Sequence, residues 1–234
     1  MTGSAGFRAL VLADGDGPDR AALDAAWPGW ETGIGLVVAA DGGAQLADRL
    51  GLPIDQWVGD GDSLGPDGLA VLRARGIPID LAQTDKDESD TELALLSAIG
   101  AGATDLTILG ALGGHRFDHT LANVGLLAHP SLEGRTARLL DADSRVSLLV
   151  GRGEGAPPVA ATLEGRPGDV VSLLPLLNDA EGVTTEGLRY PLRDETLAVG
   201  PARGLSNVRL GAMATVSVRS GRLLVIETAA TLPT

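Results

Sequence analysis

The chain has 234 residues and a formal net charge of −13, with 44% hydrophobic residues, 3% aromatic residues and no cysteine. This composition is typical of a globular protein that buries a real core, and it excludes disulfides and thiolate metal sites. The acidic balance argues against nucleic acid as a partner, because a phosphate backbone requires basic patches.

Short apolar runs alternate with helical patterns over the first part of the chain. The runs predict strands, and the segments between them predict helices. The expected strands are 8–13, 35–40, 56–59, 77–82 and 105–110, and the expected helices are 43–50, 66–75, 88–100 and 117–128. Several runs are apolar throughout, as in a parallel sheet that is covered on both faces. This alternation predicts an α/β domain with a doubly wound, mostly parallel sheet.

The last part of the chain has the pattern of an all-β domain. An apolar segment at 169–176 and an alternating segment at 214–227 predict strands. Ser220 and Gly221 suit a two-residue hairpin turn within the second of these segments. We therefore expect a smaller β-sandwich after the α/β domain.

A Gly- and Pro-rich segment, GRGEGAPP at 151–158, separates the two kinds of pattern. We place the boundary close to it, which gives an α/β domain at 1–147 and a β-sandwich domain at 148–234. No apolar run approaches the ~20 residues that a membrane span requires, so we expect no membrane partner. The start of the chain lacks the basic region and long apolar stretch of a signal peptide, and we expect a cytoplasmic protein.

Acidic and glycine-rich segments follow the predicted strands of the first domain. Ligands of an open parallel sheet bind at the carboxyl ends of its strands. The acidic residues at these ends are Asp14, Asp16, Asp41, Asp60, Asp62 and Asp90. Asp and Gly also favour loops and helix caps, which explains any single segment better than it explains the set.

Asp60 and Asp62 flank a glycine directly after the expected strand at 56–59. In an extended backbone, residues i and i+2 point the same way, so both carboxylates would face one spot. At about 4 Å they would repel by roughly 4 kcal/mol at an effective dielectric near 20. Protonation, a long salt bridge or a cation would offset this repulsion. The pair suits Mg²⁺, and Asx-turn capping is the alternative.

Two further features of the first domain suit an anion. Gly42 and Gly43 lead into an expected helix, where glycine lets the backbone approach a ligand and the helix N-terminus favours negative charge. Lys86 is the only lysine of the chain and lies among aspartates at an expected strand end. A Walker-type GxxxxGK[ST] motif is absent. Lys86 therefore lies either near a phosphate or at a solvated helix start.

The segment GGHRFDH offers two histidines and an Arg–Asp pair. His115 and His119 could share a helical face as zinc ligands, but no third ligand stands at a familiar spacing. Arg116 and Asp118 are either ordinary polar residues at a helix start or substrate contacts. In the second domain, Ser206 could simply form a turn with its neighbour Asn207.

Several short motifs occur in an order that resembles the thiamine pyrophosphokinase (thiamine diphosphokinase) family, bacterial type. They are ADGGA, GDGDS, DKDESDTELAL, GGHRFDH, TEGLRYPL, GLSN and ATVSVRSGRLLVI, and they span roughly residues 35–227. Two departures from the family pattern stand out. Gly61 occupies the place of the usual aromatic residue of GDFDS, and DESD replaces the commoner DDTD while keeping Asp90.

The resemblance implies an α/β nucleotide domain followed by a β-sandwich. It also implies a homodimer whose active sites lie between the α/β domain of one subunit and the β domain of the other. The implied reaction is Mg²⁺-dependent transfer of pyrophosphate from ATP to the hydroxyethyl group of thiamine, which gives thiamine diphosphate and AMP. A related pyrophosphokinase acting on another small alcohol, or a non-catalytic nucleotide- or thiamine-binding regulator, is the alternative.

The resemblance also implies roles for individual residues. Four aspartates would hold Mg²⁺ and the triphosphate, with Gly42 and Gly43 beside them: Asp41, Asp60, Asp62 and Asp90. Asp60, Asp62, Asp90 and Asp118 would be the catalytic acidic residues, and Asp118 or another carboxylate could accept the hydroxyl proton. Lys86 would lie near the phosphates, and Arg116 near ATP and thiamine. Ser206 and Asn207 would form the serine–asparagine pair on the thiamine side.

Overall fold

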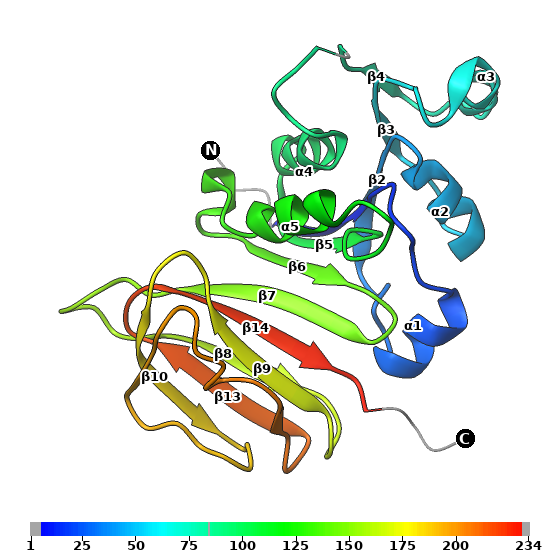
Figure 1. Cartoon of the computed structure of the whole chain (residues 1–234). Helices are drawn as coiled ribbons and strands as arrows, with labels where there is room; N and C mark the ends of the chain where they lie inside the picture. Colours follow the sequence, from blue (N-terminus) through cyan, green and yellow to red (C-terminus); the bar gives the residue numbers. More distant parts are fainter. Residues whose placement is uncertain (1–5, 84, 231–234) are drawn as a thin grey trace. The chain divides into compact units, whose positions relative to one another are not determined.

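The computed structural model describes residues 6–83 and 85–230 (Figure 1). The chain forms two compact units that divide between Ala142 and Asp143. The boundary expected from the sequence, between 147 and 148, falls inside strand β7 (Ser144–Val150) of the second unit. Within the described part of the chain, no helix is long and apolar enough to span a membrane.

The first unit is a parallel sheet with helices on its two faces. Its strands are β1 (Phe7–Leu12), β2 (Ile34–Ala40), β3 (Gln56–Gly59), β4 (Ile79–Leu81), β5 (Ala103–Leu109) and β6 (Thr136–Leu140). They lie in the order β6-β5-β1-β2-β3-β4, and each neighbouring pair is parallel. The helices are α1 (Arg20–Ala26), α2 (Gly43–Leu50), α3 (Gly65–Ala74), α4 (Asp90–Gly100) and α5 (Phe117–Leu126), with a 3₁₀ turn η1 (Pro130–Leu132).

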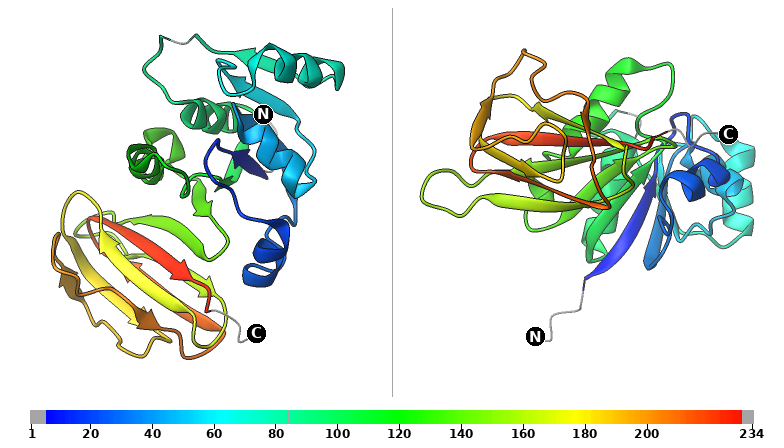
Figure 2. Two further views of the ribbon diagram at one scale, coloured as in Figure 1. Left: turned by 45° about the vertical axis from the view of Figure 1, so that its right-hand side comes forward. Right: turned by 90° about the horizontal axis from the view of Figure 1, so that it is seen from below.

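The strand order explains why the helices divide between the faces. The chain moves outward from β1 to β4 and then returns to the other side of β1 to form β5 and β6. Because such crossovers are right-handed, the reversal of direction moves the later helices to the opposite face. Figures 1 and 2 show α4 and α5 on one face of the sheet and α1 and α2 on the other. The strand order reverses between β1 and β5. In such sheets, ligands bind at the carboxyl ends of the strands next to this point.

The elements of this unit match the sequence closely where the apolar pattern is strong. The strand expected at 56–59 and the helix expected at 43–50 have the observed bounds of β3 and α2. β4 is shorter than the expected strand at 77–82, because Pro78 cannot donate to a ladder. The sequence pattern does not predict α1 or β6. α1 is a short helix whose N-cap side chain makes no capping hydrogen bond, so its start carries little signal.

The second unit is a sandwich of two antiparallel sheets. Its strands are β7 (Ser144–Val150), β8 (Val159–Glu164), β9 (Val170–Pro175), β10 (Ala180–Glu186), β11 (Glu195–Leu197), β12 (Asn207–Val208), β13 (Met213–Val218) and β14 (Arg222–Thr228). One sheet contains β12-β9-β14-β7 and the other β11-β10-β13-β8. Side chains such as Val171 and Val225 from the first sheet and Val183 and Val216 from the second form one buried core. The predicted fold class, an α/β domain followed by a β-sandwich, is confirmed.

The prediction of a β-hairpin at Ser220–Gly221 is wrong. β13 pairs with β10 and β8, whereas β14 pairs with β7 and β9. The turn therefore carries the chain from one sheet to the other. Gly221 has φ +86°, and a Cβ there would lie 2.3 Å from the carbonyl oxygen of Asp179. A turn suited to a hairpin in sequence is thus used as a tight corner between the two layers.

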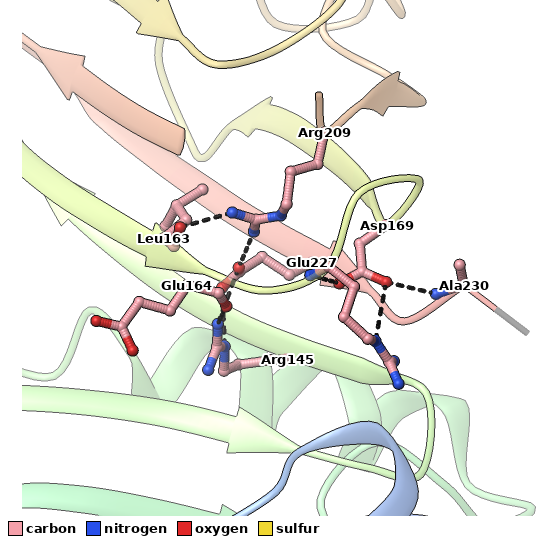
Figure 3. A network of polar contacts seen from close by, with 8 residues as sticks. Arg145, Leu163, Glu164, Asp169, Arg209, Glu227 and Ala230 are labelled. Carbon is pink, nitrogen blue, oxygen red and sulfur yellow. Dashed lines mark hydrogen bonds and ion pairs between the residues drawn. The ribbon is translucent and has the colours of Figure 1, made fainter. Parts of the chain in front are cut away.

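A buried ion network joins the strands of the second unit (Figure 3). Arg209 is 1% exposed, and its guanidinium donates to the carbonyl oxygen of Leu163 at 2.6 Å and to Oε2 of Glu227 at 2.7 Å. Arg145 donates to both oxygens of the same carboxylate, at 2.8 and 2.9 Å. A buried charge is costly without a partner. The Glu227 carboxylate is the ion-pair partner of both guanidinium groups.

We expect Glu227→Ala to lower the free energy of unfolding by about 3–5 kcal/mol, because it leaves the buried Arg209 charge uncompensated. Glu195→Ala is the matched control, since it breaks the exposed pair with Arg203 and should cost less than about 1 kcal/mol. Urea unfolding at neutral pH measures both values. Equal losses for the two variants would contradict the assignment.

Candidate active site

Three carboxylates meet at the carboxyl edge of the first unit. Asp41 follows β2, Asp60 follows β3, and Asp90 is the first residue of α4. Each offers one oxygen, and these three oxygens lie within 4.8 Å of one another. We call this group the aspartate cluster. It contains three of the four residues that the sequence analysis proposed as metal ligands.

Asp41 is the buried member of the aspartate cluster. Its Oδ2 accepts a hydrogen bond from the Ser63 N–H at 3.3 Å, and the residue is 5% exposed. Its Oδ1 has no hydrogen-bond partner among the described residues. Burial raises the pKa of Asp41 above its ordinary value of 3.8, and the charges of Asp14 and Asp90 add to the rise, while the Ser63 hydrogen bonds oppose it. An unpartnered buried oxygen beside two other carboxylates fits a cation.

The backbone of Asp41 is also unusual. Its φ of +43° lies in the left-handed region, which costs a non-glycine residue on the order of 1–3 kcal/mol. The conformation is held on both sides, because the Asp41 N–H donates to the carbonyl oxygen of Val58 and its own carbonyl accepts from Trp57 Nε1, both at 2.8 Å. Trp57 is fully buried, so the core itself fixes the direction of the Asp41 side chain.

Asp60 and Asp62 do not share one direction. Gly61 has φ +86°, so the extended backbone assumed for this stretch is wrong. The chain turns, and Oδ1 of Asp60 accepts a hydrogen bond from the Asp62 N–H at 3.0 Å. Asp62 is exposed and lies outside the aspartate cluster. The Asx-type turn and the acidic cluster, which were alternatives in the sequence, therefore occur together at Asp60.

Lys86 supplies a positive charge at the edge of the aspartate cluster. Its Nζ forms an ion pair with Oδ1 of Asp90, one helical turn away in sequence. The Lys86 side chain is 15% exposed and also lines a cavity of about 480 Å³ with Leu93 and Leu96 of α4. Ser89, not Asp90, caps α4, because its hydroxyl accepts from the Glu92 N–H at 3.2 Å. Asp90 is thus left to face Lys86 and the other carboxylates.

Gly42 and Gly43 allow a close approach between the end of β1 and the start of α2. A Cβ on Gly42 would lie 1.7 Å from Oδ1 of Asp14, and one on Gly43 would lie 2.0 Å from the carbonyl oxygen of Leu12. Asp14 in turn accepts a hydrogen bond from the Ser63 hydroxyl at 2.8 Å. The sequence places Asp14 only among the acidic residues at the strand ends, and it predicts no role for Ser63. Their signals were the position of Asp14 after the first strand and the final serine of GDGDS.

Arg116 and Asp118 form an exposed pair at the start of α5. Arg116 Nε donates to Oδ1 of Asp118 at 3.0 Å and its Nη2 to Oδ2 at 2.6 Å. These hydrogen bonds hold the pKa of Asp118 well below its usual range. Among residues 6–83 and 85–230, the group able to hold a metal contains no histidine, so His115 and His119 do not form part of one.

Ser206 and Asn207 lie in the second unit. Ser206 is exposed, has φ +57° and donates its N–H to the Ser172 hydroxyl at 3.0 Å. Asn207 is buried and lines a cavity of about 150 Å³ together with Tyr190 and Arg203. The second unit therefore carries a small cavity with an aromatic wall.

Two family models match the chain. The description "Thiamin pyrophosphokinase, catalytic domain" matches residues 31–138, and "Thiamin pyrophosphokinase, vitamin B1 binding domain" matches residues 160–223. The chain belongs to the thiamin pyrophosphokinase family. The first match contains the aspartate cluster, Lys86 and the Arg116–Asp118 pair, and the second contains Ser206 and Asn207.

Relatives and solved structures agree with this family. Thiamine pyrophosphokinase of Bacillus subtilis (strain 168) is 26% identical over 187 residues, which cover 80% of this chain and 83% of that protein. The crystal structure of a thiamin pyrophosphokinase family protein from Enterococcus faecalis is 26% identical with a TM-score of 0.77, and the match covers 96% of this chain and 100% of that chain. The structure of thiamine pyrophosphokinase from Bacillus subtilis has a TM-score of 0.80 at 23% identity, with coverage of 96% and 100%.

The resemblance read from the sequence motifs is thereby confirmed. The thiamin pyrophosphokinase family comprises transferases that use ATP as co-substrate and thiamine as acceptor, and this chain is an enzyme of that activity. The family match therefore favours an enzyme over the alternative of a non-catalytic regulator.

We expect Asp41→Asn to raise the free energy of unfolding of the metal-free protein at pH 7 by about 1 kcal/mol, as is common when a functional charge is removed. The raised pKa of Asp41 means that the folded state binds its proton more tightly than the unfolded state. Stability therefore falls as pH rises from 3.8 through the raised pKa of the folded state, and the variant should lose this part of the pH dependence.

Urea unfolding of metal-free protein between pH 4 and 8 measures the effect. Asp62→Asn is the control, because this exposed carboxylate should change metal-free stability by less than about 0.5 kcal/mol. A variant Asp41→Asn that is less stable than the wild type would contradict the account of the aspartate cluster.

Proposed function

We propose that the aspartate cluster holds Mg²⁺ and that the triphosphate of ATP binds there. The observation that carries this proposal is the buried Asp41 carboxylate. One of its oxygens lies within 4.8 Å of oxygens of Asp60 and Asp90, and its Oδ1 has no hydrogen-bond partner among the described residues. Mg²⁺ prefers one or two carboxylates together with waters and substrate phosphates. When bound, the ion neutralises negative charge on both the carboxylates and the phosphates.

Asp62 keeps a role at the edge of this site. Its N–H fixes the carboxylate of Asp60, and its own carboxylate is exposed on the same loop. We propose that Asp62 binds through the water shell of the ion. Gly42 and Gly43 shape the neighbouring wall, because any side chain at either position would meet Asp14 or the backbone of β1.

Two cationic side chains serve the phosphates in this proposal. Lys86 pairs with Asp90 of the aspartate cluster and lines the cavity of about 480 Å³, where we propose that the nucleoside of the bound ATP lies. Arg116 supplies a guanidinium fork, and preorganised positive charge stabilises charge that develops during transfer. The lowered pKa of Asp118 makes its carboxylate a weak proton acceptor. We therefore propose that Asp118 orients Arg116 and does not act as the base.

The second unit is proposed to bind thiamine through the region of Ser206 and Asn207, in agreement with its match to a vitamin B1 binding domain. The family resemblance supports a homodimer in which the α/β unit of one subunit and the β unit of the other complete each active site.

The proposed reaction begins with the hydroxyethyl oxygen of thiamine. This oxygen forms a bond to the β-phosphorus of ATP, the bond from that phosphorus to the oxygen bridging to the α-phosphorus breaks, and AMP leaves with that oxygen. The hydroxyl proton passes to water. Transfers of this kind depend on positioning and charge neutralisation more than on covalent chemistry, which is what the carboxylates, Lys86 and Arg116 provide.

Incubation with ATP, Mg²⁺ and thiamine, followed by mass spectrometry, should show thiamine diphosphate and AMP in equal amounts. We expect Asp90→Asn to lower kcat by about 10²–10³-fold, the scale of a lost electrostatic group at a reacting centre.

Asp87→Asn is the matched control for this experiment, because it removes the same charge from an exposed position on the same loop and should leave kcat within about twofold. Release of ADP in place of AMP, or equal rates for the two variants, would contradict the proposed site.

A further inference from the structure

The side-chain amide of Asn207 is almost fully occupied within the protein. Its Oδ1 accepts hydrogen bonds from the N–H groups of Tyr190 and Val208, both at 3.0 Å. Its Nδ2 donates to the carbonyl oxygen of Tyr190 at 2.7 Å. An amide side chain can accept two hydrogen bonds and donate two, so three of four places are filled. With Asn207 8% exposed, little of it remains for a ligand.

The contact between Asn207 and Tyr190 continues a short ladder that the backbone cannot extend. Leu188 and Arg209 form an antiparallel bridge, and the Arg189 N–H donates to the carbonyl oxygen of Val208 at 2.9 Å. Beyond this point the chain turns at Ser206, whose φ is +57°. The Asn207 amide takes the place of the missing backbone partner, since it bonds to both the N–H and the C=O of Tyr190 as a facing strand residue would.

The other side of Tyr190 is held in a similar way. Pro191 has no N–H, and the next residue, Leu192, donates to the Thr185 hydroxyl at 2.9 Å and accepts from the Thr185 N–H at 3.1 Å. The backbone is thus clamped before and after the proline. A clamp of this kind fixes the direction in which the Tyr190 side chain leaves the chain.

Tyr190 is the single tyrosine of the protein, and it is exposed to solvent. The residue is 60% exposed and lines the cavity of about 150 Å³ with Leu173, Leu192 and Leu205. Aromatic faces bind flat heterocycles by stacking. Thiamine contains two such rings, and a cavity of this size suits one of them.

We propose that Asn207 is a positioning residue that acts on thiamine through Tyr190. The amide fixes the Tyr190 backbone, and the tyrosine ring stacks on a heterocycle of thiamine. This inference rests on the proposed thiamine-binding role of the second unit, and it replaces a direct contact between Asn207 and thiamine with an indirect one.

A double-mutant cycle on the full-length protein tests the inference, with thiamine affinity measured by isothermal titration calorimetry in the absence of ATP. Asn207→Asp keeps an oxygen that accepts from the N–H groups of Tyr190 and Val208, but it loses the Nδ2 donor to the Tyr190 carbonyl oxygen. Tyr190→Ala removes the ring. We expect each variant to weaken thiamine binding about tenfold, the usual effect of one lost hydrogen bond or stacking contact. In the Tyr190→Ala background, Asn207→Asp should add less than about twofold, because coupled residues are not additive.

Two controls separate positioning from general damage. Tyr190→Phe keeps the ring and should bind thiamine within about twofold of the wild type, since the stacking face is unchanged. The KM for ATP should stay unchanged in every variant. If Asn207→Asp fails to fold, Asn207→Ser replaces it in the same cycle.

A full tenfold loss from Asn207→Asp in the Tyr190→Ala background would overturn the inference, because Asn207 would then contact thiamine directly. Wild-type affinity in Tyr190→Ala would overturn it as well. Failure of the proposed function is a separate result, since it would appear as wild-type protein that forms no thiamine diphosphate.

Discussion

The fold holds three carboxylates close together, and their mutual repulsion is the constraint on which the account of the site depends. Asp41, Asp60 and Asp90 hold oxygens within 4.8 Å of one another, at the ends of elements that the core fixes in place. Asp41 is the most restricted of them, because Trp57 and Val58 hold its left-handed backbone. A site of this kind stores unfavourable energy in the metal-free protein, and the dication that we propose to bind there would release it.

The parallel sheet makes this arrangement possible with few residues. Successive strands end at the same edge, so one aspartate after β2 and one after β3 come together without any long loop. The return of α4 toward the centre of the sheet adds Asp90 and brings Lys86 with it. Because β1 and β2 are neighbouring parallel strands, Asp14 after β1 lies beside Gly42 after β2. Fold and site therefore follow from the same topology.

The sequence allows much of this to be predicted, and particular residues show where it stops. Apolar runs that alternate with a helical pattern predict β2, α2 and β3. The positions of Asp41, Asp60 and Asp90 near strand ends follow from this alternation. Local geometry does not follow. Gly61 has a positive φ that turns Asp62 away from its expected direction, and the sequence alone gives no dihedral angle. The crossing of β14 into the other sheet is likewise decided by core packing and not by the turn residues. The hydrogen bonds of Asn207 to Tyr190 depend on a tertiary contact, so the sequence does not predict them.

The two units divide the work of the enzyme. The first unit gathers carboxylates where we propose that a metal–nucleotide complex binds, whereas the second unit contains the Arg209–Glu227 network and the clamp around Tyr190. The most direct measurement of the central claim is the anomalous diffraction of crystals grown with Mn²⁺ and a non-hydrolysable ATP analogue. The account predicts one ion about 2.1 Å from Oδ1 of Asp41, with further ligands from Asp60, Asp90 and the phosphates. An ion bound elsewhere, with Oδ1 of Asp41 still unpartnered, would contradict it.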